Sequence, residues 1–350
     1  MRSILRIALR RSEVDIVFER RPFVGPAALA TAALALLAAC SGQSHFTGAT
    51  RMLPALSDSQ STPVLTGHLY VANASQVQRF AISGGVPRSS PDLTYAGVSA
   101  PIALDASNDL YATRGLRIYV YPPGSTTPAR SLHIARTTLG GVRSLAIDRQ
   151  RHLYVNLIFR GIGPVVDTKA VLVYAANASG NAKPINEIIY DRCSRSFSCI
   201  LDDNDEGGMA IDESGELLVA STINQSVVRT YASPATQPLL LRSLFGNGVP
   251  DPNGVAVDTS DELFVNNPNG TSSFVAVFPA TASGSALPLR EISVFGAKSF
   301  GRGIATAAGR LFVTDPLANA VYEVSSLTGG QQTPTDKLSV ISPVDVKLGK

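Results

Sequence analysis

The feature that most limits the possible folds of this chain is a short apolar motif that recurs six times. Each copy is a run such as Leu69-Tyr70-Val71-Ala72, in which a leucine opens a segment of strand-forming residues. The opening leucines are Leu69, Leu110, Leu153, Leu217, Leu263 and Leu311, so they stand 41, 43, 64, 46 and 48 residues apart. A period of this length is typical of a four-stranded propeller blade, and the sequence therefore predicts an all-β propeller.

A second motif precedes five of these runs and predicts the innermost strand of each blade. It reads, for example, Val255-Ala256-Val257-Asp258, with large and small apolar residues in alternation. The alanines share one face, which suits a strand close to the crowded axis of a ring. Four of these segments end in an aspartate, which we expect to accept hydrogen bonds from the backbone of its own turn: Asp105, Asp148, Asp212 and Asp258. The alternative is a set of calcium sites, with Asp212, Glu213 and Glu216 as ligands.

The number of blades follows from how the two ends of the chain meet. The first unit lacks an innermost strand, and the C-terminal segment Pro343-Val344-Asp345-Val346-Lys347 supplies the missing copy. We expect this segment to pair with the first unit and to close a six-bladed ring of four-stranded blades, because an open ring would expose unpaired strand edges. In this alignment Asp345 takes the place of the alanines. A seven-bladed ring is the alternative, with its extra unit in the 64-residue spacing. We read the excess residues there, 190–207, as a loop.

The repeating unit resembles the NHL repeat. The best single match is Pro252-Asn253-Gly254-Val255-Ala256-Val257-Asp258 followed by Leu263-Phe264-Val265-Asn266-Asn267. The resemblance covers nearly all of residues 67–347 and implies a six-bladed propeller. It implies little about function, because propellers serve unrelated purposes. The aspartate that closes the second strand of the family's repeat is present here only as Asp315.

Residues 1–40 predict an export signal with a lipid anchor. An arginine-rich segment precedes a 14-residue apolar stretch that ends at Cys40, whereas a membrane-spanning helix needs about 20 residues. Leu37-Ala38-Ala39-Cys40 resembles the bacterial lipobox, which implies lipidation of Cys40 and attachment to a membrane of the bacterial cell envelope, facing the periplasm or the exterior. Export by the general or the twin-arginine route stays open. Residues 41–63 predict a flexible tether, and residues 64–350 the propeller.

The net charge of the chain belongs to this leader. The chain carries 30 basic and 27 acidic side chains, a formal charge of +3. Residues 1–40 hold six arginines against three acidic residues, so the remaining residues hold 24 basic and 24 acidic side chains. No basic stripe remains after the leader, and a nucleic-acid partner is not expected.

The other two cysteines are Cys193 and Cys199. A close cysteine pair outside the cytoplasm predicts a disulfide bond. A metal site is the alternative, but two cysteines without a nearby histidine fall short of four ligands.

Candidate functional residues gather where the innermost strands begin and the second strands end, because these ends surround one mouth of the central channel. They are Asn73, Arg114, Arg143, Asn156, Asn253, Asn266, Asn267, Arg302, Asp315 and Asp345. Arginine and asparagine there can bind a sugar, a peptide or an anionic group, with arginine favouring carboxylate or phosphate. The sequence thus predicts a non-catalytic module that needs no cofactor and binds a small polar ligand or an envelope protein. Strand-end capping is the alternative role for these side chains.

An enzyme is the alternative function. Gluconolactonase-like hydrolases and streptogramin lyases use related six-bladed rings with a bound metal, so this hypothesis expects calcium or magnesium near Asp315 or Asp345. None of the four histidines falls at the predicted mouth, and the chain has no G-x-S-x-G motif. We therefore expect no catalytic residue among the candidates.

Overall fold

The computed structural model describes residues 64–135, 138–159, 167–193, 207–222, 226–246, 248–268 and 273–350. The predicted lipidation site Cys40 and the predicted disulfide partner Cys199 lie outside these residues, so both stay predictions. The described residues form strands and turns, and they contain no helix long and apolar enough to cross a membrane.

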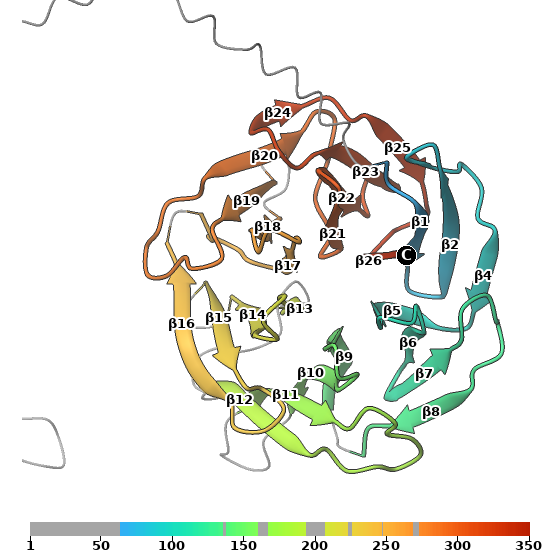
Figure 1. Cartoon of the computed structure of the whole chain (residues 1–350), viewed down its shortest axis with the longest axis vertical. Coiled ribbons are helices and arrows are strands. Elements are labelled where there is room, and N and C mark those ends of the chain that lie inside the picture. Colours follow the sequence, from blue (N-terminus) through green and yellow to red (C-terminus); the bar gives the residue numbers. More distant parts are fainter. Residues whose placement is uncertain are drawn as a thin grey trace, which may run out of the picture. The chain divides into compact units, whose positions relative to one another are not determined.

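The described strands form six sheets arranged as blades around a central axis (Figure 1), which confirms the six-bladed propeller, and the described residues contain no seventh blade. Each blade has an innermost, a second, a third and an outer strand, joined antiparallel. Blade 2 has β5 (Ser99–Leu104), β6 (Leu110–Arg114), β7 (Arg117–Tyr121) and β8 (Arg130–His133). Blade 3 has β9 (Thr138–Ile147), β10 (Leu153–Phe159), β11 (Asp167–Tyr174) and β12 (Asn186–Cys193). Blade 4 has β13 (Met209–Ile211), β14 (Leu217–Ser221), β15 (Val227–Ala232) and β16 (Leu239–Phe245).

Blades 5, 6 and 1 follow the same order. Blade 5 has β17 (Gly254–Val257), β18 (Leu263–Asn267), β19 (Phe274–Phe278) and β20 (Arg290–Val294). Blade 6 has β21 (Ile304–Ala307), β22 (Arg310–Asp315), β23 (Ala320–Ser325) and β25 (Asp336–Ser339). Blade 1 has β26 (Asp345–Gly349), β1 (Gly67–Ala72), β2 (Gln76–Ser83) and β4 (Leu93–Ala96), and the short β3 (Val86–Pro87) also pairs with β2. The predicted loop in the long spacing begins later than expected, because β12 continues to Cys193.

The ring closes as the sequence predicts, since the C-terminal β26 pairs with β1 of the first blade. The register differs from the predicted alignment. Lys347 lies opposite Tyr70, just as Ala103 lies opposite Tyr111 in blade 2. Lys347 therefore takes the alanine position, and Asp345 lies two residues closer to the start of the strand, on the same face of β26.

The apolar core is divided among the blade interfaces. Six clusters of buried residues lie between the six pairs of adjacent blades. Tyr70, Tyr111 and Tyr154 are nearly fully buried in three of them, which confirms that these recurring tyrosines pack between blades. Full burial of an apolar side chain contributes about 1.5–3 kcal/mol, so the interfaces hold the ring together.

Glycines allow adjacent innermost strands to approach closely at their starts. A Cβ atom on Gly254 would lie 2.1 Å from the carbonyl oxygen of Arg302 in the next blade. A Cβ on Gly303 would lie 2.8 Å from the Cα of Asp345, again in the next blade. The glycine of the NHL-like motif is therefore required by backbone proximity between blades.

The outer edges of some blades are covered by their neighbours. The strand β24 (Gly330–Gln332), which lies between β23 and β25 of blade 6, pairs in parallel with β20 of blade 5. Single parallel bridges join Leu132 to Gly180 and Leu244 to Gly284 in the same manner. Each link adds backbone hydrogen bonds between neighbouring blades.

Candidate functional site

The innermost strands of all six blades surround a central channel with a cavity of about 220 Å³. Its lining consists mainly of aliphatic side chains such as Ile147, Ile211 and Val257. Among the described residues that line it, Lys347 is the one charged side chain, at the position where the other five blades have alanine. The predicted alignment missed this lysine. Matching Leu348 to the large residue that follows each alanine would have found it.

The channel has two mouths, which differ in the chain segments that form them. At the strand-end mouth the innermost strands begin and the second strands end, as the pairs Ser144–Asn156 and Gly254–Asn266 demonstrate. At the turn mouth the innermost strands lead through short turns into the second strands. The predicted site residues belong to the strand-end mouth.

Three of the predicted asparagines there hold the backbone of neighbouring loops. Asn73 Oδ1 accepts the N–H groups of Ser75 and Gln76 over 2.9 and 3.0 Å. The Nδ2 group of the buried Asn156 donates to the carbonyl of Gly207 over 2.7 Å. Asn267 Nδ2 donates to the carbonyls of Gly248 and Val265, and this side chain is fully buried. These contacts cap and fasten strand ends.

The two predicted acidic residues are also engaged by backbone groups. Asp315 is fully buried, and its carboxylate accepts the N–H groups of Lys298 and Ala318 over 2.6 and 2.8 Å. Asp345 Oδ2 accepts the N–H of Ile102 in blade 2 over 3.0 Å, and its Oδ1 lies 3.1 Å from Lys347 Nζ. Asp345 therefore links the closing strand to the next blade. Among the described residues, no group of three or more His, Cys, Asp or Glu side chains is placed to hold a metal ion.

At the strand-end mouth an arginine side chain of one blade reaches the backbone of an arginine in the opposite blade. Arg302 Nη1 donates to the carbonyl of Arg143 over 2.6 Å, which joins blade 6 to blade 3 across the ring. Figure 1 shows that β21 and β9 lie on opposite sides of the channel. Arg143 is only 8% exposed, and no acidic side chain pairs with it among the described residues.

Further buried polar atoms lie at the same end of the blades. Arg143 Nε, Ser221 Oγ and Asn266 Oδ1 have no hydrogen-bond partner among the described residues. Asn253, which directly precedes β17, is 7% exposed. Arg114 ends β6 and is exposed, so it does not join the buried group. The structure thus brings Arg143, Arg302 and Asn253 together at the inner ends of blades 3, 6 and 5.

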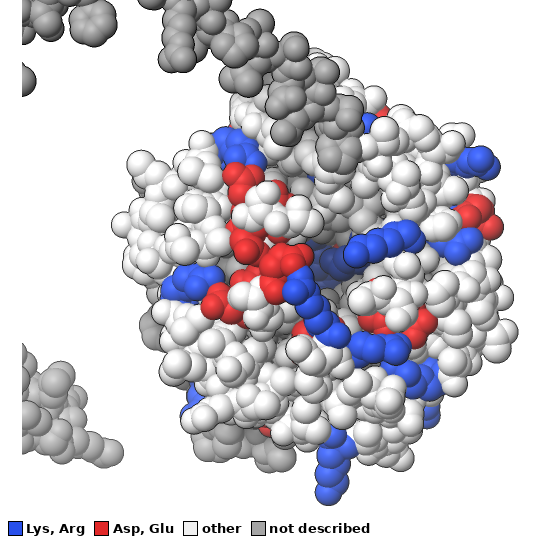
Figure 2. All heavy atoms as spheres, viewed as in Figure 1, with Lys and Arg blue, Asp and Glu red and all other residues white. Residues whose placement is uncertain are grey.

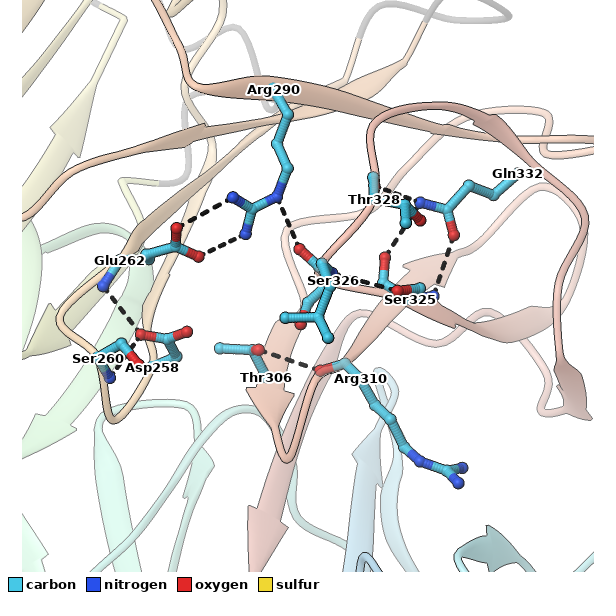
Figure 3. A network of polar contacts seen from close by, with 11 residues as sticks. Asp258, Ser260, Glu262, Arg290, Thr306, Arg310, Ser325, Ser326, Thr328 and Gln332 are labelled. Atoms are coloured by element: carbon cyan, nitrogen blue, oxygen red, sulfur yellow. Dashed lines mark hydrogen bonds and ion pairs between the residues drawn. The ribbon is translucent and has the colours of Figure 1, made fainter. Parts of the chain in front are cut away.

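The turn mouth is built from turns whose backbone N–H groups are hydrogen-bonded to an aspartate of the same turn. Asp258 Oδ1 accepts the N–H groups of Ser260 and Glu262 over 2.8 and 2.9 Å (Figure 3), and Asp105 does the same for Ser107 and Asp109. This confirms the predicted role of the repeated aspartates. Figure 2 shows acidic side chains gathered on one side of the centre of this face, with basic side chains reaching toward them.

Most arginines near these turns are paired with carboxylates. Arg151 lies 2.7 Å from both Asp105 and Asp109, and Arg242 lies 2.6 Å from Glu216. Arg290 holds Glu262 through two nitrogens (Figure 3). The hydrogen bond from Arg290 lowers the pKa of Glu262, against the opposing effect of burial.

A separate groove between blades 3 and 4 holds a histidine that the sequence analysis set aside. This groove, with a cavity of about 460 Å³, opens beside the turn of blade 3. In it, His152 Nδ1 lies 2.8 Å from Asp148 Oδ2, which also accepts the Tyr154 hydroxyl over 3.0 Å. The sequence predicted that no histidine lies at the strand-end mouth. His152 lies at the other end of the blade, beside the turn, so it does not contradict that prediction.

Comparison with known proteins supports the fold and leaves the function open. No family model and no curated protein sequence matches the chain. A chain of a nidogen–laminin complex is similar in structure, with a TM-score of 0.55 and 15% identity over 81% of this chain and 98% of that one. A protein of unknown function from Bacteroides caccae gives a TM-score of 0.57 and 11% identity over 82% and 100%. A protein from Bacteroides fragilis, proposed to be a 6-phosphogluconolactonase, gives 0.53 and 11% over 83% and 99%. At such identities the likeness concerns the propeller fold alone.

Proposed function

We propose that this protein is a non-catalytic binding propeller of the NHL-repeat type, held at the bacterial cell envelope by lipid on Cys40. Its ligand site is the strand-end mouth, and its partner is a small polar molecule or the side chains of an envelope protein. The signal pattern of residues 1–40 supports the location.

The observation that carries the binding proposal is the buried Arg143, without an acidic partner among the described residues, beside Arg302 at the axis. A nearly buried cation without a counter-charge costs several kcal/mol of desolvation. Folding alone gives no reason to retain this arginine, whereas a ligand that reaches the mouth would offset the cost. The asparagines and Asp315, by contrast, are engaged in holding the backbone.

The enzyme alternative needs a metal held by carboxylates at the same mouth. Asp315 and Asp345 were its predicted ligands, and both carboxylates accept backbone N–H groups. A hard cation there would have to displace these hydrogen bonds and lie close to two guanidinium groups. The geometry therefore supports binding over metal-assisted hydrolysis.

Three measurements test this proposal. Elemental analysis of the purified, dialysed protein is expected to find no stoichiometric calcium or magnesium, and assays with simple lactones are expected to give no turnover above buffer. One metal ion per chain together with lactone hydrolysis would refute the proposal. For the location, we expect labelled palmitate to be incorporated into the full chain and to be lost in Cys40→Ser, with Cys193→Ser as the matched control.

A further inference from the structure

The two arginines at the strand-end mouth define the chemistry of the ligand more closely. Resting on the proposed binding function, we infer that the ligand presents a carboxylate or phosphate group to Arg143 and Arg302 at the channel axis.

The charge balance at this mouth favours an anionic ligand. Lys347 is another positively charged side chain on an innermost strand. It forms an ion pair with Asp345, whose Oδ1 lies 3.1 Å from Lys347 Nζ. Arg143 has no such match among the described residues, although it is 8% exposed. An anion from outside would supply the missing charge, and charge-assisted hydrogen bonds to it are the strong kind.

The geometry of Arg302 also favours a ligand with paired oxygens. The guanidinium of Arg302 is held in place by its hydrogen bond to the Arg143 carbonyl, so it is fixed at the axis before any ligand arrives. The Arg302 side chain thus starts from blade 6 and reaches the backbone of Arg143 on the opposite blade. A planar fork of N–H donors fits the paired oxygens of a carboxylate or a phosphate, so the held guanidinium of Arg302 loses little side-chain entropy on binding.

Arginines elsewhere on the ring differ from Arg143 in their partners. Arg151, Arg242 and Arg290 each contact a carboxylate of this chain. At the turn mouth the chain therefore neutralises its own cations. At the strand-end mouth Asp315 accepts backbone N–H groups, and Asp345 accepts the N–H of Ile102 and pairs with Lys347. An external anion would therefore meet no competing ion pair at Arg143 among the described residues.

The test is isothermal titration calorimetry of the full chain at constant ionic strength, with inorganic phosphate in one arm and acetate in the other. We expect saturable binding in at least one arm, which also identifies the favoured anion. Arg143→Gln is expected to weaken it by about 10-fold or more, as loss of a charge-assisted hydrogen bond implies. Arg143→Lys is expected to recover part of the affinity, because it restores the charge without the fork. Arg149 lies in the turn that follows β9 and pairs with the exposed Glu213 at the turn mouth. Arg149→Gln is therefore the matched control and is expected to bind as the unchanged protein does.

Each of the following outcomes would overturn the inference. They are the absence of binding in both arms, equal binding by Arg143→Gln, and an equal loss in Arg149→Gln, which would indicate general charge attraction. Thermal unfolding of each variant, with and without phosphate, separates loss of binding from loss of folding, because a ligand raises the unfolding temperature only of a folded protein that binds it. Binding of glucose that Asn253→Ala removes, without any anion binding, would overturn this inference and leave the proposed binding function intact. Stoichiometric metal and lactone turnover would instead overturn the proposed function.

Discussion

The two mouths of the channel use the same residue types for different purposes. At the turn mouth, arginines face carboxylates across short gaps, as Arg151 faces Asp105 and Asp109. At the strand-end mouth, Asp315 holds backbone N–H groups and Asp345 pairs with Lys347, whereas Arg143 is buried without an acidic partner among the described residues. Burial of unlike charges together stabilises a fold only when both are satisfied. The ion pairs at the turn mouth therefore stabilise the fold. At the strand-end mouth the desolvation cost of Arg143 remains, and a bound anion can offset it.

The largest expected effect is that of removing the strand that contributes to both mouths. A chain that ends at Ser342 loses β26 and with it Asp345, the fully buried Val346 and Lys347. Blade 1 would then expose the inner edge of β1, and we expect no cooperative thermal transition in calorimetry. Deletion of Lys350 alone is the control. A truncated chain that unfolds as cooperatively as the full one would show that ring closure is dispensable.

The next effect concerns the close approach of blades at the strand-end mouth. Gly254→Ala would place a Cβ 2.1 Å from the Arg302 carbonyl oxygen, so the backbone that carries Arg302 must move. We expect a loss of about 2–4 kcal/mol in the free energy of unfolding, measured by urea denaturation. Thr259→Ala in the exposed turn of the same blade should cost less than about 0.5 kcal/mol. Equal stability of the two variants would contradict the crowding at Gly254.

A pair of charge-removing variants tests the contrast between the mouths directly. Arg290→Met leaves Glu262 without its partner and is expected to lower the free energy of unfolding by about 1–2 kcal/mol, because the pair is largely shielded from solvent. Arg143→Met removes a cation that has no acidic partner among the described residues, so we expect a change between zero and a gain of about 1 kcal/mol. The measurement is chemical denaturation of both variants. A loss of similar size in both would remove the distinction between the mouths.

The smallest effect is a pH dependence at the turn mouth. The hydrogen bond from Arg290 lowers the pKa of Glu262 below its unfolded value, so this group contributes stability above the unfolded pKa. That contribution is lost as pH falls through the lower, folded pKa. The unchanged protein should therefore exceed Glu262→Gln in stability by about 1 kcal/mol or less at pH 6, and the difference should shrink toward pH 3. A difference that stays constant over this range would show that the ion pair does not stabilise the fold.

The fold was largely predictable because each blade repeats a local pattern. The opening leucines, the alternating residues before Asp258 and the turn at Asp105 are all readable within a few neighbouring residues. For the site, the sequence predicted which strand ends surround the mouth, but not the contacts of the side chains there. Asn156, Asn267 and Asp315 stand at the right end of the ring, but the loops that they hold come from elsewhere in the chain, and local pattern does not reveal those partners.

By itself, the sequence determined the blade count, the order of the strands and the pairing of the C-terminal segment with the first blade, because period-two alternation and repeat length are local properties. Only the tertiary structure decided that Lys347, rather than Asp345, takes the alanine position in the channel, because register depends on pairing with β1. It also decided that Arg302 reaches Arg143, 159 residues away, since closing the ring brings opposite blades to one axis.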